Sequence, residues 1–541
     1  MPSDYLFTRT RAILPCRHGC LNLFTSASTC RVDSQSRLSS TKPPSVAIDP
    51  LVDVHSLENT VEAHREANRS PGLYHRYEFS PQRGLIKSRE GPQGGSNDPA
   101  AAARYEASRS LRRSLKSAQI GRGRIAGLTT QWMLTSDSKT PITQRVPWTK
   151  EVYQKALPDL VWLSAEERLS QEIEAFDAYV CPTIDEQSAA ELAANDLRRI
   201  IKNADAEMDM DIIGSRATGT ADPLSDIDAN VSLPVTPSSM KTRIRPEQIL
   251  PTIMKTIRVW RRHHPDEECP IQTLTHVKQA VVPILLCRHR KTGLPIQIQS
   301  TPRTFDSTEY VRSFLTEFPT LRGLFKVIRQ VLHMRGLQHG QHGGLTSYPL
   351  LNMIVASLKL SEGKSAPLNS GAHLLQFLKL YSEIDFADVG ISTRPLGLFS
   401  RNEDTPTEVQ KAAEASGMYV PELMGQKHMI VRLRRSGAKV PLLQDPANPM
   451  NNLGKSAVKI RDVQETFIDL HHRLHLAMQE WDTTQAQASK NTSIPRSSTA
   501  SYRHHSVLKI LLEGDYRIYD YDRADIRRAV RDMNHTTTSK I

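Results

Sequence analysis

Residues 210–234 read MDIIGSRATGTADPLSDIDANVSLP, and this stretch decides how the rest of the chain is interpreted. It predicts a short strand over 211–213, a Gly-Ser turn with a ten-residue polar loop, and a second strand. The second strand carries Asp226 and Asp228 two positions apart. Because successive side chains of a strand alternate between its faces, we expect both carboxylates on one face and Ile227 in the core.

The two aspartates and the turn before them indicate a site for a metal ion and a phosphate. Like charges held side by side repel unless a cation lies between them, so the pair favours a hard divalent metal. Gly214 allows close approach of a phosphate to the backbone, and Ser215 adds a hydroxyl. Together these features are typical of nucleotidyl transfer. Taken alone, the stretch also fits a polar loop with two solvated aspartates.

The composition indicates a multidomain protein without a membrane span. A chain of 541 residues is long enough for two or three domains. No apolar run approaches the length of a membrane-spanning helix, and residues 280–287 form one of the longest. The six cysteines show neither the spacing of a zinc site nor that of a disulfide framework. This cysteine usage is typical of a reducing compartment.

The net charge of +12 is concentrated in the N-terminal part of the chain. Residues 1–42 are rich in Arg and Ser and poor in acids, which predicts a mitochondrial transit peptide and hence the matrix; a basic disordered tail is the alternative. Residues 43–150 predict a basic, largely disordered extension with one short helix over 105–117. Its segment 104–124 fits RNA phosphate binding and equally a solvated linker.

Capping and turn residues outline an α+β domain over 151–305. Two capping boxes begin helices, a further helix follows, and a turn at 291–293 joins two strands. The residues concerned are 164–167 and 183–186 for the boxes, 246–262 for the helix, and 277–287 and 294–299 for the strands.

Helical periodicity dominates the segment 306–481. The expected helices cover 309–318, 321–337, 348–360, 373–380 and 460–481, with a long loop leading to Val440. Residues 482–541 predict a linker and a short tail over 507–533, which the sequence does not explain.

Five blocks in this order resemble the non-canonical poly(A)/poly(U) polymerases of the polymerase-beta-like nucleotidyltransferase superfamily. They are Gly214-Ser215 with Asp226-Ile-Asp228, the hairpin 280–298, the segment 324–348, the helix 373–381, and Gln444-Asp-Pro446 with 451–455. The resemblance covers roughly 160–480. It implies a nucleotidyltransferase palm over 151–305 and a helical poly(A)-polymerase-associated domain over 306–481.

The resemblance also implies roles for individual residues. Gly214 and Ser215 match the phosphate binders of the family, and Asp226 and Asp228 match its ligands for Mg²⁺ or Mn²⁺. The implied partners are an NTP, with ATP expected, and RNA.

Further matches concern the nucleotide. Arg329 stands where the family has a triphosphate-binding lysine, so the charge is kept and the geometry is changed; a solvated helix charge is the alternative. His333 replaces a second lysine. Ser347 and Tyr348 match the pair that holds the base, with the tyrosine ring as a stacking platform. Asn451 lies near the base-discriminating position, although an Asn in this loop also fits simple turn chemistry.

One departure from the family affects catalysis. The family places an aspartate at the position of Gln297, the neighbouring candidate is Gln299, and no acid occurs between residues 268 and 306. A neutral amide offers an oxygen to a metal but cannot act as a base at pH 7. Asp222 or Asp306 swinging into the site is an alternative source of a third carboxylate.

Two functions follow from these residues. The first is an RNA 3′-end nucleotidyltransferase of the poly(A)-polymerase type, acting on mitochondrial RNA with NTP and a divalent metal. The second is a catalytically silent protein of the same fold that binds RNA or a ribonucleoprotein. The four retained residues of the first block favour the enzyme, and Gln297 favours the silent protein.

Overall fold

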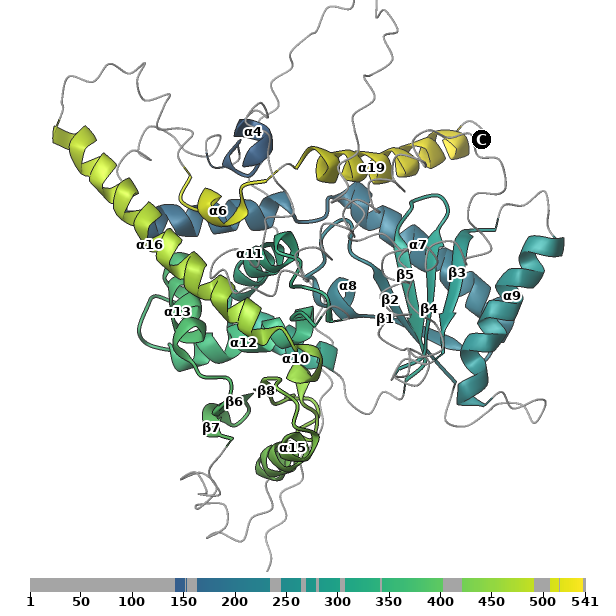
Figure 1. The fold of residues 1–541 in the computed structure, drawn as a ribbon. Helices are drawn as coiled ribbons and strands as arrows, with labels where there is room; N and C mark the ends of the chain where they lie inside the picture. The colour runs from purple at the N-terminus through teal and green to yellow at the C-terminus, as the bar shows by residue number, and fades with distance from the viewer. Residues whose placement is uncertain are drawn as a thin grey trace, which may run out of the picture. The chain divides into compact units, whose positions relative to one another are not determined.

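The computed structural model describes a large part of the chain after residue 141, and all of it falls in one compact unit, Ile48–Ile541 (Figure 1). The described residues are 142–150, 152, 163–233, 245–263, 269–278, 282–301, 307–340, 343–401, 421–490, 506–514 and 516–538. The predicted transit peptide over 1–42, the helix over 105–117 and Asp306 lie outside these ranges.

A mixed five-stranded sheet has the order β1-β2-β5-β4-β3. Its strands are β1 (Asp209–Ile213), β2 (Ile227–Ser232), β3 (Ile271–Val277), β4 (Ile284–His289) and β5 (Pro295–Gln299). β2 and β5 run parallel, and the other neighbouring pairs are antiparallel. The predicted α+β fold class is confirmed.

The prediction of a single strand over 277–287 is wrong. Val277 ends β3, and β4 begins at Ile284, directly after Pro283. Proline has no N–H to donate to a ladder, so it interrupts a strand at this point. The strand β3 itself was not predicted, although Thr273 and Thr275 give it the β-branched alternation typical of strands.

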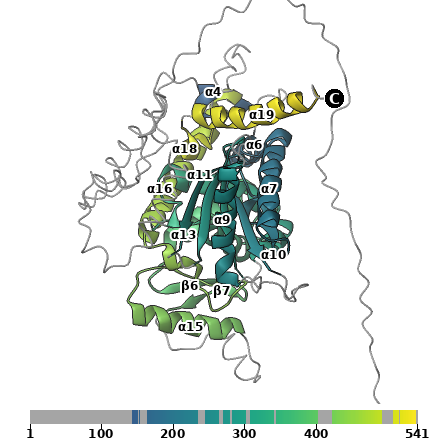
Figure 2. The same ribbon diagram turned by 90° about the vertical axis from the view of Figure 1, so that its right-hand side faces the viewer.

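Helices α7 (Ile184–Ala204) and α9 (Ile249–His263) pack against the sheet (Figure 2). We call the shared apolar cluster the palm core; it includes Leu197 and Ile201 of α7 and Ile257 of α9. From β2 it takes Ile227, which is 1% exposed, as the alternation predicts.

Both predicted capping boxes are confirmed. Ser164 caps α6 (Ala165–Tyr179) together with Glu167, and Thr183 caps α7 together with Glu186. In each box the hydroxyl accepts from the backbone N–H three residues on, and the carboxylate accepts in return. Four residues, Val180–Thr183, therefore separate two well-defined helices.

A second apolar cluster, which we call the helical core, joins most of the other long helices. These are α6, α10 (Ser307–Glu317), α11 (Leu321–Met334), α12 (Ser347–Leu360), α13 (Ser370–Glu383) and α16 (Ile460–Lys490). The last of them continues beyond the predicted end at residue 481. Among the described residues, none of the helices combines the length and apolar character needed to cross a membrane.

The expected long loop before Val440 is wrong. The segment contains a small sheet of β6 (Val389–Thr393), β7 (Leu396–Ser400) and β8 (Leu442–Leu443), together with α15 (Pro421–Ser436). The strands β7 and β8 flank β6, and β8 pairs with it across some fifty residues of chain. Short strands held by such distant partners leave a weak local signal in a sequence.

The segment that the sequence did not explain forms α18 (Lys509–Leu512) and α19 (Arg517–Thr538). Leu511, Leu512 and Tyr516 are buried in the helical core, whereas Ile526 and Val530 are buried in the palm core. This segment therefore contributes to both cores.

Candidate active site

Asp226 and Asp228 lie at the start of β2, on either side of the buried Ile227. Both aspartates are half-buried. Since Ile227 belongs to the palm core, the carboxylates lie on the sheet face opposite to α7 and α9.

Gly214 lies directly against the carboxylate of Asp228. Its φ is +68°, and a Cβ added at this position would come within 2.5 Å of Asp228 Oδ2. Glycine is therefore required here for two reasons: it tolerates the left-handed backbone, and it leaves room for the Asp228 carboxylate.

The predicted polar loop after Gly214 is partly wrong, because Gly214–Thr218 forms the one-turn helix α8. Gly219 ends it with a left-handed φ of +79°. The Ser215 carbonyl accepts from the N–H groups of Thr220 at 3.0 Å and Ala221 at 3.1 Å. These bonds turn the chain back toward β2, which brings the helix and the aspartates together.

Arg216 fixes the segment that leads into β2, a role that sequence reasoning missed. Its guanidinium donates to the carbonyls of Pro223, Ser225 and Asp226, at 3.3, 3.1 and 3.2 Å respectively. An arginine beside a Gly-Ser turn gives no local signal for these contacts, because its partners follow seven to ten residues later.

The two aspartates are poorly suited to carry negative charge without a cation. Burial raises the pKa of Asp226 to about 6, against the opposing effect of Arg329. Burial and the neighbouring Asp226 carboxylate raise the pKa of Asp228 to about 7. A divalent cation would favour the ionised form of both groups, so the residues fit a metal held by two carboxylates. Within the described ranges, no group of three His, Cys, Asp or Glu side chains is arranged to hold a metal ion.

Gln297 occupies the place beside Asp228 at which the family resemblance implies a third carboxylate. In the parallel pairing of β2 and β5, Asp228 and Gln297 are direct partners. Gln299 pairs with Asn230 two residues further along, and its amide donates to Thr301. The neutral side chain at 297 is therefore the one next to the aspartate.

Asp222 and Arg329 form an ion pair with an Oδ2–Nη1 distance of 2.6 Å. Asp222 lies in the segment 219–226 before β2, which we call the catalytic segment because it ends at the candidate metal ligand Asp226. Arg329 lies on α11, so the pair joins this segment to the helical part of the chain. Arg329 is the candidate triphosphate ligand, and Asp222 is a candidate third carboxylate. The structure therefore pairs two residues for which the sequence predicted separate roles. His333, one turn further along α11, is half-buried.

Lys326 lies one turn before Arg329 and was not singled out from the sequence. Only 4% of it is exposed, and its ammonium donates to the carbonyls of Ala221 at 2.8 Å and Val180 at 3.3 Å. Its charge is used inside the protein to hold two backbone segments together.

The residues predicted to hold the nucleoside form a second group around Asp445. Tyr348 Oη donates to Asp445 Oδ1 at 3.0 Å, and Asn451 Nδ2 donates to Asp445 Oδ2 at 2.9 Å. Burial and the Asp445 carboxylate raise the pKa of Tyr348, so its hydroxyl remains a donor. Ser347 and Tyr348 are half-buried at the start of α12. Asp445 belongs to the last of the five sequence blocks, but its contacts with Tyr348 and Asn451 were not predicted.

Comparisons with known proteins identify similar chains and a matching palm domain. The family model described as "Poly(A) RNA polymerase, mitochondrial-like, central palm domain" matches residues 169–303. Poly(A) RNA polymerase protein 1 of Saccharomyces cerevisiae is 25% identical over 63% of this chain and 48% of its own length. The inactive non-canonical poly(A) RNA polymerase protein Trf4-2 of Drosophila melanogaster is 25% identical over 58% of this chain and 70% of its own length.

The solved polymerase core of TRAMP, an RNA surveillance complex, has a TM-score of 0.49 and 19% identity, covering 68% of this chain and 99% of that chain. The chain spans about half the length of the first curated relatives it matches, at 48%, 46% and 43%. By the palm match over residues 169–303 and by the named relatives, the chain is similar to the non-canonical poly(A) RNA polymerases.

Proposed function

We propose that the chain is an RNA 3′-end nucleotidyltransferase of the poly(A)-polymerase type, which uses an NTP, with ATP expected, and Mg²⁺ or Mn²⁺. The observation that carries this proposal is the packing of Gly214 against Asp228, with Asp226 beside it. Holding a left-handed backbone against two half-buried carboxylates costs folding free energy. Such an arrangement is typical of a functional site, here one for a metal and a phosphate.

In the proposed reaction the 3′-hydroxyl oxygen of RNA bonds to the α-phosphorus of the NTP and its proton passes to solvent, while the bond between the α-phosphorus and the bridging oxygen breaks, releasing pyrophosphate. A bound divalent metal supplies charge neutralisation of the triphosphate and activation of the attacking hydroxyl. Asp226 and Asp228 would hold it, while Gly214 and Ser215 approach the phosphates. Tyr348 would stack on the base.

The nucleoside part of the site supports this assignment. Asp445 accepts from both Tyr348 and Asn451, so these two side chains are held in fixed positions before any ligand binds. Preorganised donors and platforms lose little entropy on binding. The Tyr348 ring, oriented from one end of α12, is proposed as the stacking surface, and Asn451 as a contact to the base.

The second candidate is a catalytically silent protein of the same fold, and Gln297 favours it. Loss of one strong transition-state contact costs on the order of 10²–10³ in rate. The ion pair of Asp222 with Arg329 adds to this argument, because it neutralises the cation proposed for the triphosphate. A silent protein would retain nucleotide or RNA binding without transfer.

We further propose a mitochondrial matrix location and a division into a palm over 151–305 and a helical domain over 306–481. The Arg-rich, acid-poor residues 1–42 and the mitochondrial-like description of the matching family model support the location. The basic segment 104–124 is proposed to bind RNA phosphate.

Incubation of the full chain with an RNA primer, each labelled NTP, and Mg²⁺ or Mn²⁺ tests the proposal. Extension by the native protein that is lost in Asp226→Ala supports the enzyme and excludes the silent protein. No extension by the native protein, with extension by Gln297→Asp, overturns the enzyme and assigns the defect to the third carboxylate position.

A further inference from the structure

The four-residue junction Val180–Thr183 connects two separate hydrophobic cores. Before it, α6 packs in the helical core; after it, α7 packs in the palm core. The last carbonyls of a helix have no donors within the helix, so those at the end of α6 need partners from elsewhere. Those partners determine how firmly the junction is held.

Two buried cations donate hydrogen bonds to three successive carbonyls, the last one of α6 and the first two of the junction. Arg523 of α19 donates to the carbonyls of Tyr179 at 2.5 Å and Cys181 at 3.3 Å. Lys326 of α11 donates to the carbonyl of Val180 between them, at 3.3 Å. Arg523 is 6% exposed and Lys326 is 4% exposed. Cations at a helix C-terminus also interact favourably with its dipole, so the junction is held by charge from two elements.

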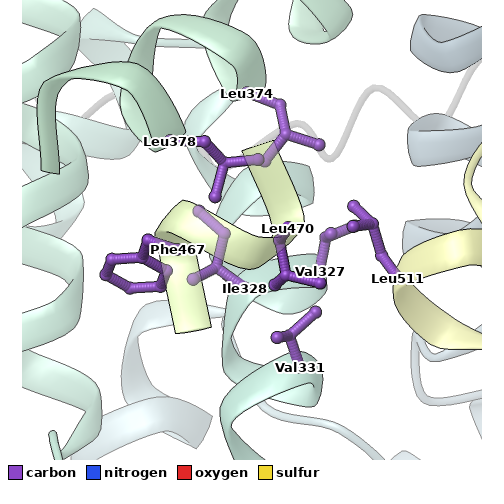
Figure 3. A pocket seen from close by; sticks show the side chains of 8 residues that line it. All are labelled: Val327, Ile328, Val331, Leu374, Leu378, Phe467, Leu470 and Leu511. Atoms are coloured by element: carbon purple, nitrogen blue, oxygen red, sulfur yellow. The ribbon is translucent and has the colours of Figure 1, made fainter. Parts of the chain in front are cut away.

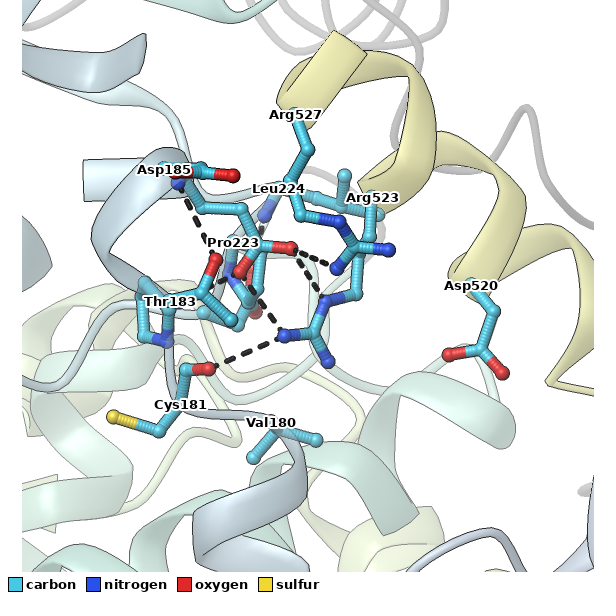
Figure 4. Close-up of polar contacts among 12 residues, drawn as sticks. Val180, Cys181, Thr183, Asp185, Pro223, Leu224, Asp520, Arg523 and Arg527 are labelled. Carbon is cyan, nitrogen blue, oxygen red and sulfur yellow. Dashed lines mark hydrogen bonds and ion pairs between the residues drawn. The ribbon is translucent and has the colours of Figure 1, made fainter. Parts of the chain in front are cut away.

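Arg523 is itself fixed by Glu186, the capping residue of α7. Its Nε and Nη2 donate to the two carboxylate oxygens at 2.8 and 3.0 Å, a bidentate pair (Figure 4). Arg527 adds a bond to the same carboxylate at 2.9 Å. Glu186 is fully buried. One guanidinium therefore joins the end of α6 to the beginning of α7.

The segment that carries Arg523 is anchored on both sides of the junction. Leu511 of α18 lines a small apolar cavity with residues of α11, α13 and α16 (Figure 3). The backbone N–H of Tyr516 donates to the carbonyl of Gln144 at 3.3 Å. Further along, Ile526 and Val530 are buried in the palm core. The C-terminal segment is thus a non-covalent bridge between the two cores.

The junction is also linked to the catalytic segment before β2. Lys326 donates to the Ala221 carbonyl at 2.8 Å, directly before Asp222, which pairs with Arg329. Burial and the nearby Asp222 carboxylate raise the pKa of Tyr519, so this residue of α19 lies close to the same ion pair. In Figure 4, Pro223 and Leu224 of the catalytic segment are drawn among the residues around Arg523 and Arg527.

We propose that Arg523 is a positioning residue for the nucleotide site, through which the C-terminal helix fixes the junction and the catalytic segment 219–226. The expected effect on nucleotide affinity rests on the proposed function, whereas the expected effect on the junction does not. Displacement of α19, by a binding partner or by a substitution, releases the junction and lowers nucleotide affinity without touching any residue that contacts the nucleotide.

Arg523→Lys in the full chain tests the proposal. Lysine keeps the charge opposite Glu186, but a single ammonium cannot reach both carbonyls and both carboxylate oxygens. The matched control is Arg527→Lys, on the same helix, because Arg527 donates to Glu186 and is 29% exposed. A second variant, Arg523→Gln with Glu186→Gln, removes both charges together, so neither is left buried alone.

Two measurements are made on each variant. The first is amide hydrogen exchange of residues 180–183 and 219–226 in the ligand-free protein. We expect exchange in both segments to accelerate about tenfold in Arg523→Lys, because hydrogen bonds to a charged group are lost, and to remain unchanged in Arg527→Lys. The second is transfer kinetics with ATP and Mn²⁺, where we expect the KM for ATP to rise by about tenfold with a smaller change in kcat.

Equal exchange in the two single variants, or acceleration confined to α19 itself, overturns the positioning role. Accelerated exchange at 180–183 without any change at 219–226 also overturns it, because the link to the catalytic segment is then absent. If the native protein transfers no nucleotide to RNA, the proposed function fails, and the exchange measurement still decides the inference.

Discussion

Replacement of Gly214 by alanine changes one position at which backbone conformation and the candidate metal site coincide. Gly214 has a φ of +68°, and a Cβ there would lie 2.5 Å from Asp228 Oδ2 and 3.2 Å from its Cγ. Ordinary contact begins near 3.4 Å, so the oxygen has to move by about 0.9 Å. The carboxylate is held by a buried strand, which leaves its side-chain torsions to absorb the movement.

Two separate effects follow from this geometry. The left-handed backbone costs an alanine about 1–2 kcal/mol of stability, which for a protein of this size lowers Tm by a few degrees. The displacement of Asp228 acts on catalysis instead. Movement of a catalytic group by about 1 Å costs up to about 100-fold in rate, so we expect kcat to fall between about 10-fold and 100-fold.

Gly219→Ala separates the two effects. Gly219 has a φ of +79°, and nothing lies within 4 Å of an added Cβ, so the backbone strain is matched and the contact with Asp228 is absent. Gly363→Ala, with the same φ and the same open space, is a control away from the site. We expect all three variants to lose similar stability in thermal unfolding, and only Gly214→Ala to lose primer extension.

A readout that does not need turnover completes the test. The increase in Tm on adding ATP with Mn²⁺ reports binding by mass action, and we expect it to shrink in Gly214→Ala alone. If Gly214→Ala and Gly219→Ala lose activity and ligand-induced stabilisation to the same extent, backbone strain explains both. The close approach of Gly214 to Asp228 then has no functional role.

The remaining predictions concern the other parts of the site. Asp222→Asn frees Arg329 from its carboxylate, so the KM for ATP is expected to fall about threefold or more; an unchanged KM contradicts a role for Arg329 in phosphate binding. Asp445→Asn replaces one of the two acceptor oxygens with an amide donor, so Tyr348 and Asn451 are no longer both held, and we expect discrimination between ATP and UTP in primer extension to weaken about tenfold. Burial raises the pKa of Glu186, but its hydrogen bonds from Arg523 and Thr183 outweigh this, and the net pKa is lowered. Its contribution to stability is thus present above its ordinary pKa of 4.5 and declines as pH falls below it. Urea unfolding at pH 7 and pH 4 is expected to show a smaller difference in Glu186→Gln than in the native protein.

Local patterns predicted the part of the fold that depends on local interactions. The two capping boxes are complete within four residues each, and the helices of the helical core follow apolar periodicity. The alternation around Ile227 placed this residue in the core, because burial of every second side chain is a property of a single strand.

Features that depend on distant partners were not predictable in this way. Tyr348 and Asp445 are separated by 97 positions, and Arg523 and Glu186 by 337. Neither pair leaves a trace in its own neighbourhood of the sequence. The same reasoning applies to β8, whose two residues are a strand because β6 lies beside them.

Of the two departures from the family pattern, Gln297 lies beside Asp228, and Arg329 pairs with Asp222. Gln297 removes a carboxylate beside Asp228, and Asp222 places one near Asp226, where it contributes to the raised pKa of that residue after burial and Arg329. Without nucleotide, Arg329 neutralises Asp222 through a 2.6 Å contact. A triphosphate that binds Arg329 competes for this cation, and Asp222 then carries an uncompensated charge next to the aspartate pair. Nucleotide binding at Arg329 would therefore leave an additional negative charge beside Asp226, which ties the question of activity to this ion pair.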